Sequence, residues 1–204
     1  MIIEQPPFYY RLFFPGSHWR FNPEEKVIYL TFDDGPVPEI TPWVLELLKQ
    51  YGIKATFFCV GDNVRKYPEI YQMILDGGHQ TGNHTYHHIQ GLKTRTKNYR
   101  RDVDQAAGLI RTKLFRPPYG HLRIRQFLQL KNNYKIVMWD VVTRDYSKYL
   151  TSEQVFGNVK KYARPGSVIV FHDSIKAGNR MKEALPRSIE WLLEQGYHFQ
   201  LIPE

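Results

Sequence analysis

Histidine and aspartate residues that could bind a metal ion occur at two places in the sequence. His84 and His88 are four positions apart, so their imidazoles can lie on one side of a helical turn and reach the same cation. His87 would then point away, and we interpret it as a bystander. Asp33 and Asp34 can supply a third ligand. Adjacent residues at the end of a strand point to opposite sides, so one carboxylate can bind metal while the other accepts a proton from water.

Each motif has a simpler explanation when it is taken alone. Residues 84–88 would be a histidine-rich surface loop, and residues 33–35 an Asp-Asp-Gly turn. Together, two histidines and one aspartate favour a three-ligand site with open positions, which is typical of a catalytic metal centre. Such a ligand set suits Zn²⁺, with Co²⁺, Ni²⁺ or Fe²⁺ as substitutes.

Two further residues have the chemistry to assist hydrolysis. His172 could act as a general acid, since the unperturbed pKa of histidine, about 6.5, suits proton donation near neutrality. Arg116 is followed by two prolines that fix its backbone. A rigidly held cation can keep a neighbouring carboxylate ionised and in position. The alternative for Arg116 is a surface salt bridge, which contributes little.

The composition limits the classes of function. The chain has 204 residues and a net charge of +8, but its basic residues are spread along the sequence and no nucleic-acid-binding motif is present. We therefore expect a solvated basic surface and no nucleic-acid partner. Cys59, the single cysteine, excludes an intramolecular disulfide, and its apolar neighbours indicate a buried packing residue.

The sequence also bears on the cellular location. No apolar run approaches the roughly 18 residues needed to cross a bilayer, so we expect no transmembrane segment. Residues 1–7 lack the basic and apolar blocks of a secretory signal. The sequence as written therefore predicts a cytoplasmic protein, with the cell-envelope periphery as the alternative if the N-terminus is truncated. The oligomeric state is not readable from the sequence.

Strand-like and helix-like segments alternate along most of the chain. Residues 1–25 are rich in proline and aromatic residues, so we expect an irregular arm packed on one domain formed by residues 26–204. The expected strands are 26–32, 54–60, 134–139, 167–171 and 198–201. The expected helices are 41–52, 67–76, 96–114, 122–132, 152–162 and 182–195. This alternation predicts parallel β-α-β units, in a barrel or in a doubly wound sheet.

Both architectures carry their reactive residues where strands end and loops begin. The candidate residues follow this rule. Asp33 and Asp34 follow the first expected strand, Asp140 and the preceding Trp139 end another, and His172 follows the strand over 167–171. We therefore expect the loops at one edge of the sheet to form a single site.

Four motifs in the same order resemble those of a known family. Thr31-Phe-Asp-Asp-Gly-Pro36, His84-Thr-Tyr-His-His88, Arg116-Pro-Pro-Tyr-Gly120 and Val170-Phe-His-Asp173 are similar to motifs of the polysaccharide deacetylases, carbohydrate esterase family 4, with the NodB homology domain. The resemblance covers residues 26 to 200. It implies a distorted, incomplete (β/α) barrel that is seven-stranded and TIM-like, and metal-dependent removal of N-acetyl groups from a glycan.

The resemblance implies a role for each matching position. The catalytic base falls on Asp33, and the metal ligands fall on Asp34, His84 and His88. The arginine that positions the base falls on Arg116.

The same resemblance places the general acid at His172 and the oxyanion-binding backbone N–H at Tyr119. Separately, the aromatic residues near the loops can stack on sugar faces: Tyr119, Trp139 and Tyr146. Val170 stands where the family usually has leucine in the pocket for the acetyl methyl group.

The sequence departs from the family pattern between Trp139 and Tyr146. Val142 occupies the position of an aspartate that typically tunes the acid histidine, and Tyr146 replaces a tryptophan. Asp145 matches the second aspartate of the motif. The sequence leaves open whether Asp145 or Asp140 is the partner of His172.

The expected function is hydrolysis of N-acetyl groups on N-acetylglucosamine-type units of peptidoglycan or chito-oligosaccharide, with release of acetate. A carbohydrate O-acetyl esterase is one alternative, since the same residues can cleave acetyl esters. A catalytically weak glycan-binding pseudoenzyme is the other, because Val142 changes the surroundings of the acid.

Overall fold

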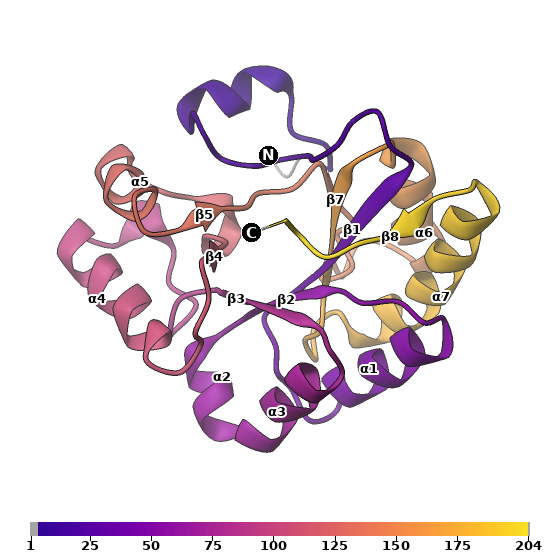
Figure 1. Cartoon of the computed structure of the whole chain (residues 1–204), viewed down its shortest axis with the longest axis horizontal. Coiled ribbons are helices and arrows are strands. Elements are labelled where there is room, and N and C mark those ends of the chain that lie inside the picture. Colours follow the sequence, from indigo (N-terminus) through magenta and orange to yellow (C-terminus); the bar gives the residue numbers. More distant parts are fainter. Residues whose placement is uncertain (1–3, 204) are drawn as a thin grey trace.

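The computed structural model describes residues 4–203 and shows a parallel α/β architecture (Figure 1). The strands pair in the order β5-β4-β3-β2-β1-β7-β6, and β8 pairs with the start of β1. Their bounds are β1 Val27–Asp33, β2 Thr56–Cys59, β3 Gln80–Asn83, β4 Leu114–Phe115, β5 Lys135–Ile136, β6 Val141–Val142, β7 Ser167–His172 and β8 His198–Phe199. All these pairings are parallel.

Helices surround the outer face of this curved sheet (Figure 1). The α-helices are α1 Thr41–Gln50, α2 Gly61–Lys66, α3 Pro68–Asp76, α4 Thr96–Ala107, α5 Ile124–Leu130, α6 Ser152–Tyr162 and α7 Gly178–Glu194. Short 3₁₀ helices are η1 Phe8–Phe13, η2 Gly91–Lys93 and η3 Pro118–Gly120. No helix in residues 4–203 combines the length and apolarity needed to cross a membrane.

Strand β1 lies inside the sheet, between β2 and β7, and is buried along its whole length. Ile28, Leu30 and Phe32 alternate along it and join the apolar cluster that packs against the outer helices. Val27 and Tyr29 belong to a second cluster, on the inner side of the curved sheet. This period of two directs alternate residues to opposite faces.

The curved sheet is an incomplete barrel, as predicted. Its two edge strands are β5 and β6, and no ladder joins them within residues 4–203. The N-terminal arm, residues 4–25, runs across this gap, and Figure 1 shows it in indigo across the top of the view. His18 forms a parallel bridge with Val137, directly after β5, and the Glu4 carbonyl accepts a hydrogen bond from the Val142 N–H of β6 at 2.8 Å.

Residues 1–3 of the expected arm and Glu204 of the expected domain lie outside the described residues. The division into an arm over 1–25 and a domain over 26–204 stays a prediction.

Helices form where the sequence supplies clear start signals. Thr151 accepts a hydrogen bond from the Gln154 N–H at 3.2 Å, and Gln154 accepts one from the Thr151 N–H at 2.9 Å. This capping box satisfies N–H groups that have no partner within the helix, and α6 matches the predicted helix over 152–162.

The predictions were wrong for several weaker elements. The helix expected over 96–114 ends at Ala107, and Leu114 lies in β4. No strand was expected over β3, because Gln80–Asn83 lacks an apolar pattern. Gly82 permits this strand, since a Cβ atom there would lie 2.4 Å from the ring of Phe58 on β2. Strands β4 and β6, of two residues each, and the six-residue helix α2 are too short for a periodic signal.

Candidate active site

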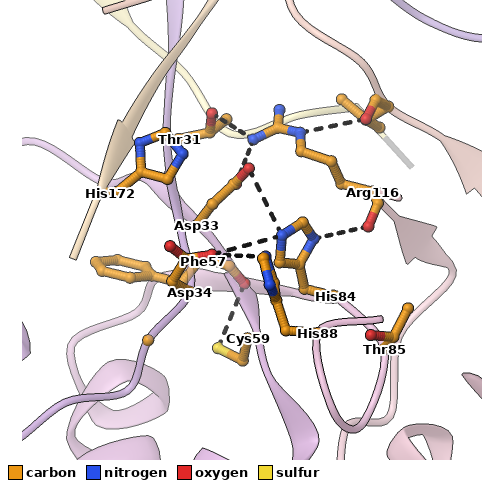
Figure 2. Close-up of polar contacts among 12 residues, drawn as sticks. Thr31, Asp33, Asp34, Phe57, Cys59, His84, Thr85, His88, Arg116 and His172 are labelled. Atoms are coloured by element: carbon orange, nitrogen blue, oxygen red, sulfur yellow. Dashed lines mark hydrogen bonds and ion pairs between the residues drawn. The ribbon is translucent and has the colours of Figure 1, made fainter. Parts of the chain in front are cut away.

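Asp34, His84 and His88 come together at the carboxyl ends of β1 and β3 (Figure 2). Nε2 of His88 lies 3.1 Å from Oδ1 of Asp34, and Nε2 of His84 lies 3.7 Å from the same oxygen. One ligand atom from each residue lies within 4.8 Å of the others. We call these three residues the triad.

The backbone around the triad does not form the expected helical turn. Residues 84–90 lie outside any helix, and Thr85 and His88 adopt left-handed φ angles of 63° and 54°. Asn83 holds this segment, because its Oδ1 accepts from the Thr85 N–H at 2.9 Å while its Nδ2 donates to the Val103 carbonyl at 3.0 Å. The two imidazoles therefore meet through two unusual φ angles rather than through helical spacing.

The triad has the donor set of a divalent metal site. Nδ1 of His84 lies 2.7 Å from the Arg116 carbonyl, which can only accept a hydrogen bond, so Nδ1 carries the hydrogen and Nε2 keeps its lone pair. Burial lowers the pKa of His84 to about 4 and keeps the ring neutral. Burial raises the pKa of Asp34, but His88, His172 and His84 outweigh it and hold that pKa well below its usual range. Two imidazole nitrogens and a carboxylate oxygen thus fit a cation such as Zn²⁺.

Asp33 lies beside the triad and is held by a different partner. Its Oδ1 accepts a hydrogen bond from the Arg116 guanidinium at 2.6 Å, and its Oδ2 lies 4.0 Å from Nε2 of His84. Asp33 ends β1, whereas Asp34 has a φ angle of 85°. The two adjacent carboxylates therefore face different partners.

Arg116 is fully buried and all its contacts fix its position (Figure 2). Besides Asp33, its guanidinium donates to Thr31 Oγ1 at 2.9 Å and to the carbonyls of Val137 and Met138. It also lies over the ring of Phe58, 4.0 Å from the ring centre. The guanidinium of Arg116 is therefore held inside the barrel by several partners, and it does not form the surface salt bridge considered as the alternative.

His172 ends β7 on the other side of the two carboxylates (Figure 2). Its Nδ1 bonds to Asp145 Oδ1 at 2.8 Å. Burial lowers the pKa of His172, but the charge and hydrogen bond of Asp145, with the charges of Asp34 and Asp33, raise it to about 9. The partner of His172 is therefore Asp145 and not Asp140, a choice that the sequence left open.

Asp140 faces away from the site. Its carboxylate accepts hydrogen bonds from Arg164 at 2.6 and 2.8 Å, from Arg11 at 3.2 Å and from Ser167 at 2.8 Å. It connects the N-terminal arm to the start of β7.

Asp173 is a residue near the site to which the sequence analysis gave no role. Its carboxylate accepts hydrogen bonds from the Gly35 N–H at 3.0 Å and from the Thr41 hydroxyl at 2.6 Å. Burial raises the pKa of Asp173 to about 8 despite these two hydrogen bonds. Asp173 therefore ties the turn after Asp34 to the start of α1. The sequence signal that could have pointed to Asp173 is its position next to His172 in the fourth motif.

Two residues that were predicted to take no part in the chemistry, His87 and Cys59, lie outside the triad. His87 pairs with Asp102 through Nδ1 and Oδ2 at 2.5 Å. Cys59 is buried, and burial raises the pKa of its thiol well above the usual range, so it does not suit a nucleophile.

A cavity of about 880 Å³ lies over these groups. Arg116 and Asp145 do not line it, but each contacts a residue that does: Arg116 contacts Asp33, and Asp145 contacts His172. The predicted residues that do line it are Asp33, Asp34, His84, His88, Tyr119, Trp139, Tyr146, Val170 and His172. Of the lining residues that sequence reasoning missed, three belong to the N-terminal arm: Pro6, Tyr10 and Trp19. Others, among them His121, Met138 and Lys176, lie on loops of the barrel.

Tyr119 lies at the mouth of this cavity. Its φ angle is 61°, its side chain is exposed, and its ring centre lies 4.8 Å from that of His88. The next residue, Gly120, packs closely on Trp139, since a Cβ atom there would lie 2.3 Å from the indole. A second hollow of about 410 Å³ adjoins the triad and shares Asp34 and His88 with the first.

Fold and site together define a class of protein. An open parallel α/β barrel carries at its strand ends an Asp-His-His cluster, a second carboxylate and a carboxylate-paired histidine, which is the equipment of a hydrolytic enzyme. The sequence model of a family described as polysaccharide deacetylase matches residues 21–139. The chain belongs to the polysaccharide deacetylase family, and the predicted enzyme class is thereby confirmed.

Individual relatives agree with this assignment. A peptidoglycan-N-acetylglucosamine deacetylase from Bacillus cereus is 36% identical over 186 residues, covering 86% of this chain and 66% of that protein. Another from the same species is 32% identical over 194 residues, covering 91% of each. A crystal structure of a peptidoglycan N-acetylglucosamine deacetylase matches with a TM-score of 0.89 and 32% identity, covering 97% of this chain and 95% of that one.

Proposed function

We propose that this protein removes N-acetyl groups from N-acetylglucosamine units of a glycan chain in a reaction that requires a divalent metal ion. The observation that carries the proposal is the position of Asp33. It is fixed by Arg116 at 2.6 Å and lies beside the triad, in the same cavity as His172. A base, a cation site and an acid thus border one space.

Asp34, His84 and His88 would hold the ion. When bound, a divalent cation supplies a Lewis acid that polarises the acetamide carbonyl and makes water more acidic. Zn²⁺ fits two imidazoles and a carboxylate, and Co²⁺, Ni²⁺ and Fe²⁺ accept the same donors.

Asp33 acts as the general base. Its carboxylate accepts a proton from the water molecule that attacks the acetamide carbon, and a new C–O bond forms. The guanidinium of Arg116 holds this carboxylate in place.

His172 acts as the general acid. Its Nδ1 faces Asp145, so a proton on Nε2 is available to the leaving nitrogen as the C–N bond breaks. The products are acetate and a free amine. The backbone N–H of Tyr119 donates to the oxyanion, and Trp139 and Val170 line the space for the acetyl methyl group.

The two adjoining hollows support a chain-like substrate. They share Asp34 and His88, so a glycan can extend from the larger hollow past the triad into the smaller one. The two Bacillus cereus relatives and the crystal structure described above are peptidoglycan deacetylases, which supports a peptidoglycan-type glycan, with chito-oligosaccharide as a soluble equivalent.

Acetate release from tetra-N-acetylchitotetraose and from peptidoglycan, before and after chelation, tests the proposal. We expect chelation to abolish release and added Zn²⁺ to restore it. Asp33→Asn should bind the metal normally but lose activity by about 100- to 10,000-fold, the usual contribution of a general base. Undiminished release after chelation would contradict the metal requirement, and retained turnover by Asp33→Asn would reassign the base.

The same assay separates the alternatives. Faster release from acetylated xylan than from the N-acetylated glycans would indicate an O-acetyl esterase. Binding of the glycans without release from any acetylated substrate would indicate a pseudoenzyme.

A further inference from the structure

The N-terminal arm forms one wall of the cavity over the triad. Pro6, Tyr10 and Trp19 line the same space as His84, His88 and His172. None of these three arm residues belongs to the four sequence motifs, and their place in the cavity depends on the path of the arm across the gap between β5 and β6.

Aromatic rings connect the arm to the triad. The ring centres of Tyr10 and Trp19 are 6.4 Å apart, and those of Trp19 and Trp139 are 6.5 Å apart. Trp139 packs on Gly120, next to Tyr119, whose ring contacts His88. The cavity thus has a wall of aromatic rings that begins at Tyr10 and ends beside the triad, with Gly120 between Trp139 and Tyr119.

The arm is held firmly enough to present this wall. Glu4 pairs with Arg144, and Arg11 pairs with Asp140 at 3.2 Å. The His18 carbonyl accepts a hydrogen bond from the Met138 N–H at 2.7 Å. Because these contacts lie before and after Tyr10 in the chain, the position of its ring is fixed without substrate, which lowers the ordering cost of binding.

Tyr10 differs from its neighbours on η1 in where its ring lies. Phe8 and Phe13 are 77% and 62% exposed, whereas Tyr10 is partly buried and lines the cavity. A tyrosine ring offers an apolar face to the C–H groups of a sugar ring and keeps a polar tip for water. Of the rings on η1, that of Tyr10 is therefore placed to contact a glycan.

We propose that Tyr10 is a specificity-determining residue that stacks on a sugar unit next to the one that is deacetylated. The inference rests on the proposed function and deepens it: the arm makes the site selective for oligomeric glycans over a single N-acetylglucosamine. Trp19 supports the Tyr10 ring from behind, since it is 4% exposed and packs at 86° to it.

The test compares kcat/KM for tetra-N-acetylchitotetraose with that for N-acetylglucosamine. We expect Tyr10→Ala to lower this ratio about three- to tenfold, the usual contribution of an aromatic contact, mainly through the KM of the tetrasaccharide. Tyr10→Phe keeps the ring and should keep most of the preference. Phe8→Ala, on the same short helix but outside the cavity, should leave both rates unchanged.

Two results would overturn the inference: an unchanged ratio in Tyr10→Ala, with or without an equal loss on both substrates, or a loss in Tyr10→Phe as complete as in Tyr10→Ala. Calorimetric binding of the tetrasaccharide provides a readout that does not need turnover. If the wild-type protein released no acetate, the proposed function would fail. Weaker tetrasaccharide binding by Tyr10→Ala than by Phe8→Ala would still support the contact, and equal binding would refute it.

Discussion

The Nδ1 atom of His172 lies 2.8 Å from Oδ1 of Asp145, and the backbone N–H of His172 donates to Oδ2 of the same carboxylate at 2.7 Å. This two-point contact fixes both the ring and its backbone. Arg180 holds Asp145 in turn by donating to its carbonyl at 2.6 Å. The carboxylate missing at Val142 is thus supplied three residues later in the chain.

Replacing Asp145 should lower the pH at which activity falls on the alkaline side of the pH–activity profile. We call this fall the alkaline limb. The acid must be protonated, so activity falls as the pH rises through the pKa of His172, about 9 in the native protein. Asp145→Asn removes the charge that raises this pKa, and the limb should move to lower pH by about one unit or more. Rates of acetate release from pH 6 to 10 measure it.

Asp140→Asn is the matched control, because Asp140 contacts Arg164 and Arg11 instead of His172. It should leave the position of the limb unchanged. An alkaline limb that stayed in place in Asp145→Asn would show that this pair does not set the protonation of the acid.

Arg116 and Asp33 should be strongly coupled in stability. Arg116→Met leaves the Asp33 carboxylate buried without its cation, and we expect the free energy of unfolding to fall by about 3–5 kcal/mol. In an Asp33→Asn background the same change should cost less, because no charge is left unpaired. A double-mutant cycle from urea unfolding measures the coupling. If the losses in the free energy of unfolding were strictly additive, the Arg116–Asp33 pair would make no contribution of its own.

Two glycines should respond to alanine in opposite directions. Gly166 has a φ angle of 80°, and a Cβ atom there would lie 1.6 Å from the Phe21 carbonyl oxygen of the arm. Gly166→Ala should therefore destabilise the protein by about 2 kcal/mol or more. Gly157 lies inside α6 with no atom within 4 Å of its Cβ position. Gly157→Ala should stabilise by about 0.5–1 kcal/mol. Thermal unfolding distinguishes the two, and equal shifts would contradict the close approach of the arm.

His79 should make the fold sensitive to acid. Burial, with the charge of Lys54, lowers the pKa of His79 to about 4, and its Nδ1 lies 3.2 Å from the Ala55 N–H that donates to it. The unfolded chain therefore binds this proton more readily than the native state. The contribution of His79 to the free energy of unfolding should be fully present above about pH 6.5 and should fall by about 2–3 kcal/mol as the pH approaches 4.

Urea unfolding between pH 7 and 4, with a chelator present, tests this dependence. His79→Leu should be less stable at pH 7 but lose less stability on acidification. His198→Gln, at an exposed position, should retain the wild-type slope. A slope that is the same in His79→Leu as in the wild type would exclude His79 as the cause.

The elements that the sequence predicted best have strong local signals. Thr151 and Gln154 cap α6 within the helix itself, so four residues suffice to place its start. Strand β3 has no such signal, since it depends on Gly82 lying against Phe58, a residue of another strand.

The same distinction applies to the site. The meeting of Asp34, His84 and His88 was predictable from their side-chain types and from the spacing of the two histidines. The strand β3 that places the histidines was not, so the left-handed φ angles that bring their rings together were not foreseen. The contact of Tyr10 with the cavity was not predictable either, because it depends on the arm crossing a gap between strands over a hundred residues away in sequence.

The arm bonds to both free borders of the open sheet. Its backbone contacts the Ile136 carbonyl and the Met138 N–H at one border and the Val142 N–H at the other. A protein trimmed back past residue 25 would leave these groups as templates on which a second copy could add a strand. We therefore expect the truncated protein to self-associate through added β-strands. This association would precede any measurement of its catalytic activity.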